Sequence, residues 1–397
     1  MIMRRHFVLL TAVALIAGRG AAAGNHQAEQ ALESAVAHLW SQQAEDGGWH
    51  SPQYGVLKSG QALTPFVFHA QLLAIDALSS DEAGRVLRAA RFIENHLNDA
   101  GALGCFDPEL TEYPVYSTAY ALECFLRVQS HRRLLGDDGD RAIQRMRRYL
   151  LAAQFDEADG FTDADPAYGG WGFQAALEAG KSGHMDLAHT RRALEALGAA
   201  TSRDASTRPS SIKAQVFLRL LQKDPQSASR QPPVDGAATI RSVPPFDGGF
   251  YFSPVVLEAN KGRLDAEPTP HFRSYATATC DGVLALLAAG VPRDDPRVAA
   301  AVEWLRAHSD LDYPQGVPTD HPEPWGEAIR FYHYAVRAEV YRKLDFPPTE
   351  RAALAMAVAK LQREDGSFVN TASPLMKEDD TVLCTALAVV ALANCRP

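Results

Sequence analysis

Two neighbouring carboxylates in this chain stand where they could act as an acid. Asp379 and Asp380 come directly before an uncharged run over 382–393. Carboxylates at the start of an apolar helix cap its free amide groups and interact favourably with its dipole. A carboxyl group beside a cavity can instead donate a proton. Both interpretations, a helix cap and a catalytic acid, therefore apply to Asp379 and Asp380.

Aromatic and ionisable residues also stand at the starts of the other apolar stretches. They are Thr64, Tyr113, Tyr116, His189, His271, Arg273, Tyr275, Arg330, Tyr332, His333 and Tyr334. If the fold brings these starts together, the group suggests a ligand pocket for an isoprenoid tail, an anionic head group, a sugar or a peptide strand. Alternatively, Arg273 and Arg330 neutralise Asp379 and Asp380 and keep them ionised, and an ionised carboxylate cannot protonate an alkene.

The pattern of the sequence predicts that six pairs of helices position these residues. The first helix of each pair is amphipathic and ends at a glycine-containing turn: we expect these helices at 27–43, 81–97, 141–154, 210–222, 295–308 and 349–362. The second is rich in Ala, Val, Leu and Thr and nearly uncharged: these are expected at 62–78, 116–128, 186–197, 273–289, 327–344 and 379–393.

Amphipathic helices cover a core, whereas helices that are apolar all round must themselves be covered. The pattern therefore predicts an all-α protein, an α/α toroid of six inner and six outer helices, with the inner N-termini converging at one end. The polar linker around 223–246 is interpreted as a long connection between two repeats, not as a domain boundary. We accordingly expect a single domain over residues 24–397.

Residues 1–23 have the features of an export signal. Arg4 and Arg5 precede an apolar run over 7–17, and three alanines at 21–23 offer a cleavage site. The two arginines resemble a twin-arginine signal, with the general export route as the alternative. The run is shorter than the roughly 20 residues of a membrane-spanning helix. We therefore expect a periplasmic or secreted protein without a transmembrane helix once the signal is removed.

The charge balance argues against nucleic acid as a partner. The formal net charge is −9, and removal of the three arginines in 1–23 leaves 36 basic against 48 acidic residues, or −12. Nucleic-acid-binding proteins need a basic surface, so this class is disfavoured. The oligomeric state stays open.

The glycine turns carry a resemblance to a known family. Gln43-x3-Gly47-x-Trp49 and Gln362-x3-Gly366-x-Phe368 resemble the QW motif of squalene cyclases, and the segments 169–173 and 247–250 look like degenerate copies. Over most of residues 27–397 the chain resembles the terpenoid cyclase and protein prenyltransferase superfamily, in particular bacterial prenyltransferase and squalene oxidase repeat proteins. The motif itself is structural, because its aromatic and Gln staple a helix end.

The resemblance implies roles for two segments. Class II terpene cyclases carry Asp-x-Asp-Asp with the middle Asp as proton donor, and the matching position here is Asp379, although Lys377 replaces the first Asp. Protein prenyltransferases bind zinc through Asp, Cys and His. His333 resembles their His ligand, but the segment 272–275 lacks the Asp and Cys. A catalytic zinc needs three protein ligands, so we expect neither a metal nor another cofactor.

Three functions follow as hypotheses. The first is an exported toroid whose central cavity binds an isoprenoid or other lipid-like ligand. The second is a class II terpene cyclase-like enzyme that protonates an alkene through Asp379. The third is a non-catalytic peptide- or glycan-binding scaffold. Glycan processing ranks low, because glycosidases need two carboxylates across a cleft and Asp379 has no evident second partner.

Overall fold

The computed structural model describes residues 26–75, 78–105, 107, 110–130, 134–200, 208–223, 246–265 and 271–396. The expected export signal, residues 1–23, lies outside this part of the chain, and so does most of the expected linker at 223–246.

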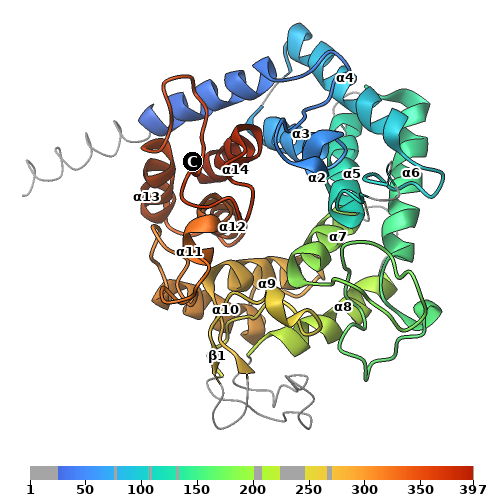
Figure 1. Cartoon of the computed structure of the whole chain (residues 1–397), viewed down its shortest axis with the longest axis vertical. Helices are drawn as coiled ribbons and strands as arrows, with labels where there is room; N and C mark the ends of the chain where they lie inside the picture. Colours follow the sequence, from blue (N-terminus) through green and yellow to red (C-terminus); the bar gives the residue numbers. More distant parts are fainter. Residues whose placement is uncertain are drawn as a thin grey trace, which may run out of the picture.

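Six helices form a closed inner ring (Figure 1). They are α3 (Leu63–Ala74), α5 (Pro114–Ser130), α7 (Leu187–Ala200), α9 (Ala276–Ala288), α12 (Arg330–Lys343) and α14 (Thr381–Cys395). Each packs against its predecessor and successor, and the ring closes where α14 packs against α3. The expected all-α toroid is therefore confirmed.

An outer layer of helices surrounds this ring (Figure 1). It consists of a helix at 26–41, α4 (Ser80–His96), α6 (Gly136–Ala152), α8 (Arg208–Leu221), α10 (Pro296–Ala307) and α13 (Pro348–Ala359). Short helices lie in the connections: α2 (Gly55–Lys58), α11 (Trp325–Ala328) and the 3-10 turns η1 (Glu157–Asp159) and η3 (Leu257–Ala259). A two-residue ribbon pairs β1 (Leu264–Asp265) with β2 (His271–Phe272).

Burial of the helices follows the polarity of their residues. In α6, Ile143, Met146 and Leu150 are buried, while Arg141 and Arg148 are exposed. In α14, eleven of fifteen residues are buried. Ala, Val, Leu and Thr suffice for α14 because neighbours cover it on nearly every side.

A glutamine at the end of four outer helices ties neighbouring repeats together. Gln43 Nε2 donates to the carbonyl oxygens of Gly47 and Arg85, both at 3.0 Å, and Arg85 belongs to the next outer helix. Gln154 and Gln222 do the same. Gln362 Nε2 donates to Gly366 O at 2.9 Å and to Ala31 O at 2.7 Å. This last bond joins the final outer helix to the first.

The glycine of each such turn lies directly against the next outer helix. Gly366 has a φ of +82°, and a Cβ there would meet the carbonyl oxygen of Ser34 at 2.7 Å. The turn needs glycine both for its backbone conformation and for this close approach.

A threonine in the inner helix completes the turn in five repeats. The Oγ1 of Thr64 accepts the backbone N–H of Trp49 at 2.9 Å, and the pattern recurs at Thr118, Thr190, Thr279 and Thr385. In α12 the residue at the corresponding height is His333, whose Nε2 lies 3.1 Å from the carbonyl oxygen of Asp310. His333 therefore joins an inner helix to an outer loop.

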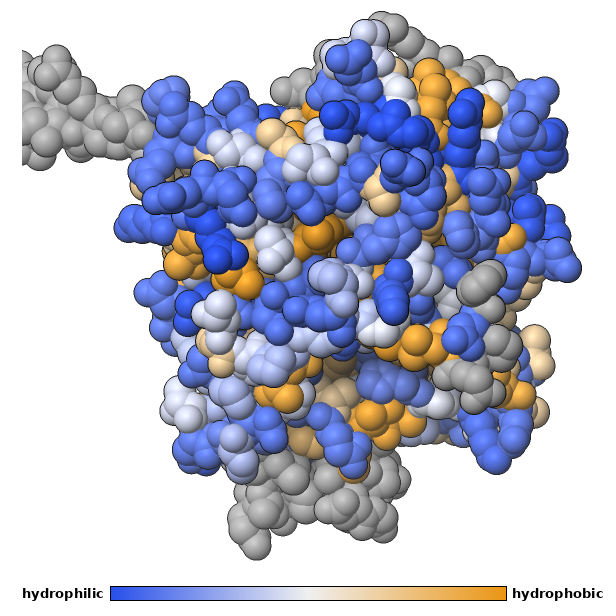
Figure 2. All heavy atoms as spheres, turned by 45° about the horizontal axis from the view of Figure 1, so that its top comes forward, coloured by the Kyte–Doolittle hydropathy of each residue, from blue (hydrophilic) through white to orange (hydrophobic). Residues whose placement is uncertain are grey.

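Hydrophilic side chains predominate on the face shown in Figure 2, and apolar ones form small, separate patches. Among the described residues, no helix combines the length and the apolar character that crossing a membrane would require.

Candidate functional site

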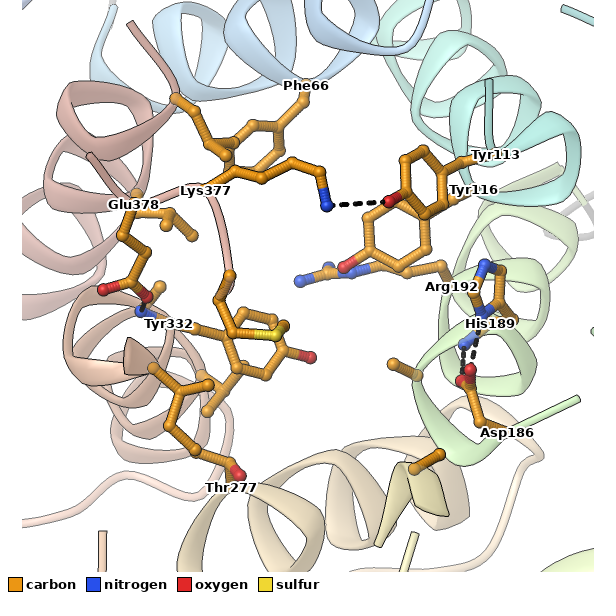
Figure 3. Close-up of a pocket in the computed structure, with 18 of the residues that line it drawn as sticks. Phe66, Tyr113, Tyr116, Asp186, His189, Arg192, Thr277, Tyr332, Lys377 and Glu378 are labelled. Carbon is orange, nitrogen blue, oxygen red and sulfur yellow. Dashed lines mark hydrogen bonds and ion pairs between the residues drawn. The ribbon is translucent and has the colours of Figure 1, made fainter. Parts of the chain in front are cut away.

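The six inner helices enclose a cavity of about 510 Å³ at the centre of the ring (Figure 3). All six contribute lining residues, and the segments that precede α5, α7, α9 and α14 contribute others. The volume lies within the range of small-molecule pockets, which is roughly 300 to 1,000 Å³.

One wall of the cavity is apolar. It is formed by α3, α12 and α14, which are neighbours in the ring, and its residues are Leu63, Phe66, Val336, Leu383, Leu387 and Val390. Removing an apolar ligand surface from water against such a wall contributes about 25 cal/mol per Å². This wall can therefore hold a hydrocarbon group.

The other side of the cavity carries polar and aromatic groups from α5, α7 and nearby loops. They include Tyr113, Tyr116, Tyr120, His184, His189, Arg192 and Lys261. The cavity is thus amphiphilic, with its apolar and polar halves on different helices.

Arg192 lines the cavity and also belongs to a buried ionic network. Its Nη1 lies 2.9 Å from Glu195 and 3.1 Å from Glu339, and its guanidinium lies 4.8 Å from the centre of the Tyr120 ring. Burial alone would raise the pKa of Glu339, but Arg191 and Arg192 lower it to about 2.

Arg191 links this network to the wall of the cavity. Its guanidinium is fully buried and lies 2.9 Å from Asp281. Asp281 in turn accepts a hydrogen bond of 2.8 Å from the hydroxyl of Tyr332, which lines the cavity. Both arginines have carboxylate partners, so their charges are largely neutralised within the protein.

Asp186 holds two histidines at the edge of the cavity. It accepts hydrogen bonds from the backbone N–H of His189 at 2.9 Å and from His189 Nδ1 at 2.9 Å, and its Oδ2 lies 3.1 Å from His184 Nε2. These interactions outweigh burial and hold the pKa of Asp186 well below its usual range. The hydrogen bond that His184 donates to Asp186 raises the pKa of His184.

Lys261 is a cation in largely apolar surroundings. Its Nζ lies 4.7 Å from the centre of the Trp325 ring and 5.4 Å from that of Phe252. Burial lowers the pKa of Lys261 to about 8, although the charge of Asp186 opposes this effect.

Glu378 is the carboxylate that reaches the cavity from the segment before α14. It accepts hydrogen bonds from the backbone N–H groups of Phe331 and Tyr332, at 2.9 and 2.7 Å, and from Asn370 Nδ2 at 2.8 Å. Burial nevertheless raises the pKa of Glu378 to about 7. Its position at the start of α12 makes it a helix cap as well as a lining residue.

The predicted acid pair lies beside Glu378 but is not part of the lining. Asp380 is the N-cap of α14, because its Oδ1 accepts the N–H of Leu383 at 2.9 Å, and its Oδ2 accepts from Ser51 at 2.5 Å. Asp379 accepts from Tyr54 at 2.5 Å and from Gln53 at 3.3 Å. The capping interpretation is therefore confirmed for Asp380. Asp379 as a proton donor stays a hypothesis.

Arginine neutralisation of this pair is not what the structure shows. The partners of Asp379 and Asp380 within the described residues are hydroxyl, amide and backbone N–H groups. Arg273 is exposed. The Nζ of Lys377 donates a hydrogen bond to the hydroxyl of Tyr113 (Figure 3).

The eleven residues expected at the helix starts divide into two groups. Five line the cavity: Tyr113, Tyr116, His189, Tyr275 and Tyr332. The other six lie outside its lining: Thr64, His271, Arg273, Arg330, His333 and Tyr334. His333 and Tyr334 face away because helical rotation points them at the outer layer, where His333 reaches Asp310. His271 lies in the β1–β2 ribbon.

Several ionisable lining residues were not predicted from the sequence, among them Asp186, Arg192, Lys261 and Glu378. Asp186 had a signal, because it stands three residues before His189 at a helix start. Lys261 had none, since it lies in an irregular loop. Among the described residues, no cluster of three His, Cys, Asp or Glu side chains is arranged to hold a metal ion.

Comparison with known proteins places the fold. No family model and no curated protein matches the sequence. A solved structure of the type II terpene cyclase MstE from Scytonema, a variant in complex with geranylgeranyl dihydroxybenzoate, is similar with a TM-score of 0.56 and 15% identity over 94% of this chain and 98% of that one. A second MstE variant, in complex with merosterolic acid A, has a TM-score of 0.57 and 16% identity, again over 94% of this chain and 98% of that one. The structure of a protein from Actinoplanes has a TM-score of 0.52 and 17% identity over 92% of this chain and 98% of that one. At these identities the likeness shows the fold alone, a terpene cyclase-like α/α toroid.

Proposed function

We propose that this protein binds an isoprenoid or similar lipid-like ligand in its central cavity. The apolar tail lies against α3, α12 and α14, and the polar head group faces His189, Lys261 and Lys377. The observation that carries the proposal is the division of one cavity of about 510 Å³ into an apolar wall and a polar, partly cationic side.

The similar toroid MstE supports this ligand class, because its complexes hold a geranylgeranyl-bearing compound with a dihydroxybenzoate group. That compound combines an apolar tail with a polar head, which is the combination that the two sides of the present cavity suit. The export of the protein, expected from residues 1–23, remains part of the proposal.

Filling the cavity tests the proposal. Ala335 of α12 lines the cavity, and Ala335→Phe would place a ring in the space of the ligand tail. The same substitution at exposed Ala353 of α13 is the matched control. We expect an isoprenoid carboxylic acid to bind the wild-type protein and Ala353→Phe in calorimetry, and to bind Ala335→Phe at least about tenfold more weakly. Equal affinities for all three proteins would contradict the proposal.

A second candidate function is proton-initiated cyclisation with Asp379 as the donor, as the resemblance implies. The observation in its favour is that Asp379 directly follows Glu378, a cavity-lining carboxyl group with a pKa of about 7. The test is turnover of a polyprenyl substrate by the wild-type protein, Asp379→Asn and Glu378→Gln. Loss of turnover in Asp379→Asn alone would support this donor, whereas full turnover in that variant would exclude it.

A further inference from the structure

His189 lines the cavity and has one ring nitrogen without a hydrogen-bond partner among the described residues. Its residue is 6% exposed and lines the cavity wall, and its Nδ1 is engaged by Asp186 at 2.9 Å. Its Nε2 is buried and has no hydrogen-bond partner within the described part of the chain. A buried polar atom without a hydrogen-bond partner is unfavourable, so a ligand group that hydrogen-bonds to it gains affinity.

The hydrogen bond to Asp186 decides which chemistry Nε2 offers. Asp186 is held in its ionised form by its contacts with His184 and His189, so it accepts and Nδ1 of His189 donates. With the proton on Nδ1, neutral His189 leaves the lone pair of Nε2 directed at its surroundings. Asp186 thereby fixes the ring and stabilises the imidazolium that forms when Nε2 takes a proton.

The helix alone does not explain this arrangement. Asp186 already caps α7 by accepting the backbone N–H of His189. A cap requires nothing of the imidazole, and any side chain at residue 189 would leave the cap intact. The contact between the carboxylate and Nδ1 is therefore additional, and it fixes the orientation of a ring that belongs to the cavity lining.

Lys261 supplies the charge that a deprotonated ligand would need. It lines the same cavity, and its charge influences both His184 and Asp186. Its ammonium has a hydrogen bond of 3.3 Å to Ala259 O and otherwise lies over the rings of Phe252 and Trp325. An ammonium group in such apolar surroundings gains more from an anionic partner than one in water does.

We infer that His189 and Lys261 form a head-group subsite for a ligand with an acidic hydroxyl group, with Asp186 as the positioning residue. The hydroxyl O–H bond breaks, its proton forms an N–H bond at His189 Nε2, and the oxygen keeps the electron pair. The resulting oxyanion faces the ammonium of Lys261. This inference rests on the proposed function, since the apolar wall must hold the rest of the same ligand.

A nitrophenol that carries a long alkyl chain tests the subsite. Its phenolate absorbs at longer wavelength than its phenol, and its methyl ether has the same tail but no acidic proton. The buffer is set about one pH unit below the pKa of the free probe, so that the free phenol is mostly neutral. We expect the phenolate band to increase on binding to the wild-type protein, and the phenol to bind at least about tenfold more tightly than the ether.

Variants assign the proton. His189→Gln keeps a polar side chain of similar size but has no basic nitrogen, so the phenolate band is lost and the ratio of phenol to ether affinity falls toward one. Lys261→Met keeps the apolar stem and reduces the band. His321→Gln, at an exposed histidine outside the cavity, behaves as the wild-type protein does.

Each remaining outcome contradicts the inference in a distinct way. Equal binding of phenol and ether to the wild-type protein, without a phenolate band, overturns the subsite but leaves cavity binding of the tail intact. A phenolate band that persists in His189→Gln shows that another group takes the proton. If neither probe binds the wild-type protein, the proposed function itself fails, and this inference fails with it.

Discussion

Lys377 and Tyr113 meet across the cavity, and both have a left-handed backbone. Lys377 Nζ lies 3.3 Å from the hydroxyl oxygen of Tyr113, and their φ angles are 60° and 50°. Within the described residues, Asp345 is the one other non-glycine residue with a positive φ. A side chain in this conformation costs roughly 1 to 2 kcal/mol, so the surrounding contacts must hold these two residues in place.

The strain at Lys377 predicts an unusual order of stabilities. Lys377→Met loses the contact with Tyr113 but keeps the unfavourable backbone, whereas Lys377→Gly loses the contact and relieves the backbone. We expect Lys377→Gly to be the more stable variant by about 0.5 to 1 kcal/mol in urea unfolding. Lys360, an exposed residue with a φ of −63°, is the control, and there the glycine variant should be the less stable. If the Gly and Met variants had the same order of stability at both positions, the backbone strain at Lys377 would be refuted.

Glu378 should make stability depend on pH in the mildly acidic range. The folded protein raises the pKa of Glu378 from 4.5 to about 7, so between these values the folded state binds more protons than the unfolded state. This group therefore destabilises the protein progressively as the pH rises from about 4.5 to 7. Unfolding free energies measured across this range should fall with pH more steeply for the wild-type protein than for Glu378→Gln. If the unfolding free energies of the two proteins changed in parallel with pH, the raised pKa of Glu378 would be contradicted.

Asp380 and Asp379 should differ in their contribution to stability. Asp380→Ala removes the N-cap of α14 and the partner of Ser51, so we expect a loss of about 1 to 2 kcal/mol. Asp380→Asn keeps a capping oxygen and should lose less. Asp379→Ala, which removes hydrogen bonds only from Tyr54 and Gln53, should cost less than Asp380→Ala in thermal unfolding. A larger loss at Asp379 would be inconsistent with these roles.

The buried arginine network should be sensitive to the loss of one member. Arg191→Met leaves Asp281 and Glu339 without one of their cationic partners, and we expect it to destabilise the protein by about 3 to 5 kcal/mol. Arg141, whose ion pair with Asp138 is exposed, is the matched control, and Arg141→Met should change stability by less than about 1 kcal/mol. Similar effects at both positions in chemical unfolding would show that burial of the network is not what makes it important.

The fold could be predicted from the sequence because the same event is repeated six times. Amphipathic stretches, glycine turns and uncharged stretches alternate, so each inner and outer helix is identified by its own polarity and by its place in the series. The one expected helix at 327–344 is divided into α11 and α12, with Ile329 between them. Nothing in the apolar pattern marks that break.

The site could be predicted only where it follows from helix starts. Five of the expected residues line the cavity: Tyr116, His189 and Tyr332 stand in the first turn of an inner helix, and Tyr113 and Tyr275 directly precede one. His333 was expected in the cavity because histidine side chains often take part in binding and catalysis. Its position instead matches that of the threonines that bind the turns in the other repeats. Lys261 could not be found, because its approach to Trp325 depends on how a loop folds over the finished ring.

The bond from Gln362 to Ala31 has a consequence for how the chain reaches its native state. In an open solenoid, a terminal repeat can be missing and the others still stack. Here the first outer helix can contact one of its two neighbours only after the last repeat has been synthesised. The same holds for α3, which packs against α14. Ring closure therefore couples the beginning of the chain to its end. We accordingly expect the toroid to melt in one cooperative transition, and truncation at either end to expose apolar surface on both sides of the gap.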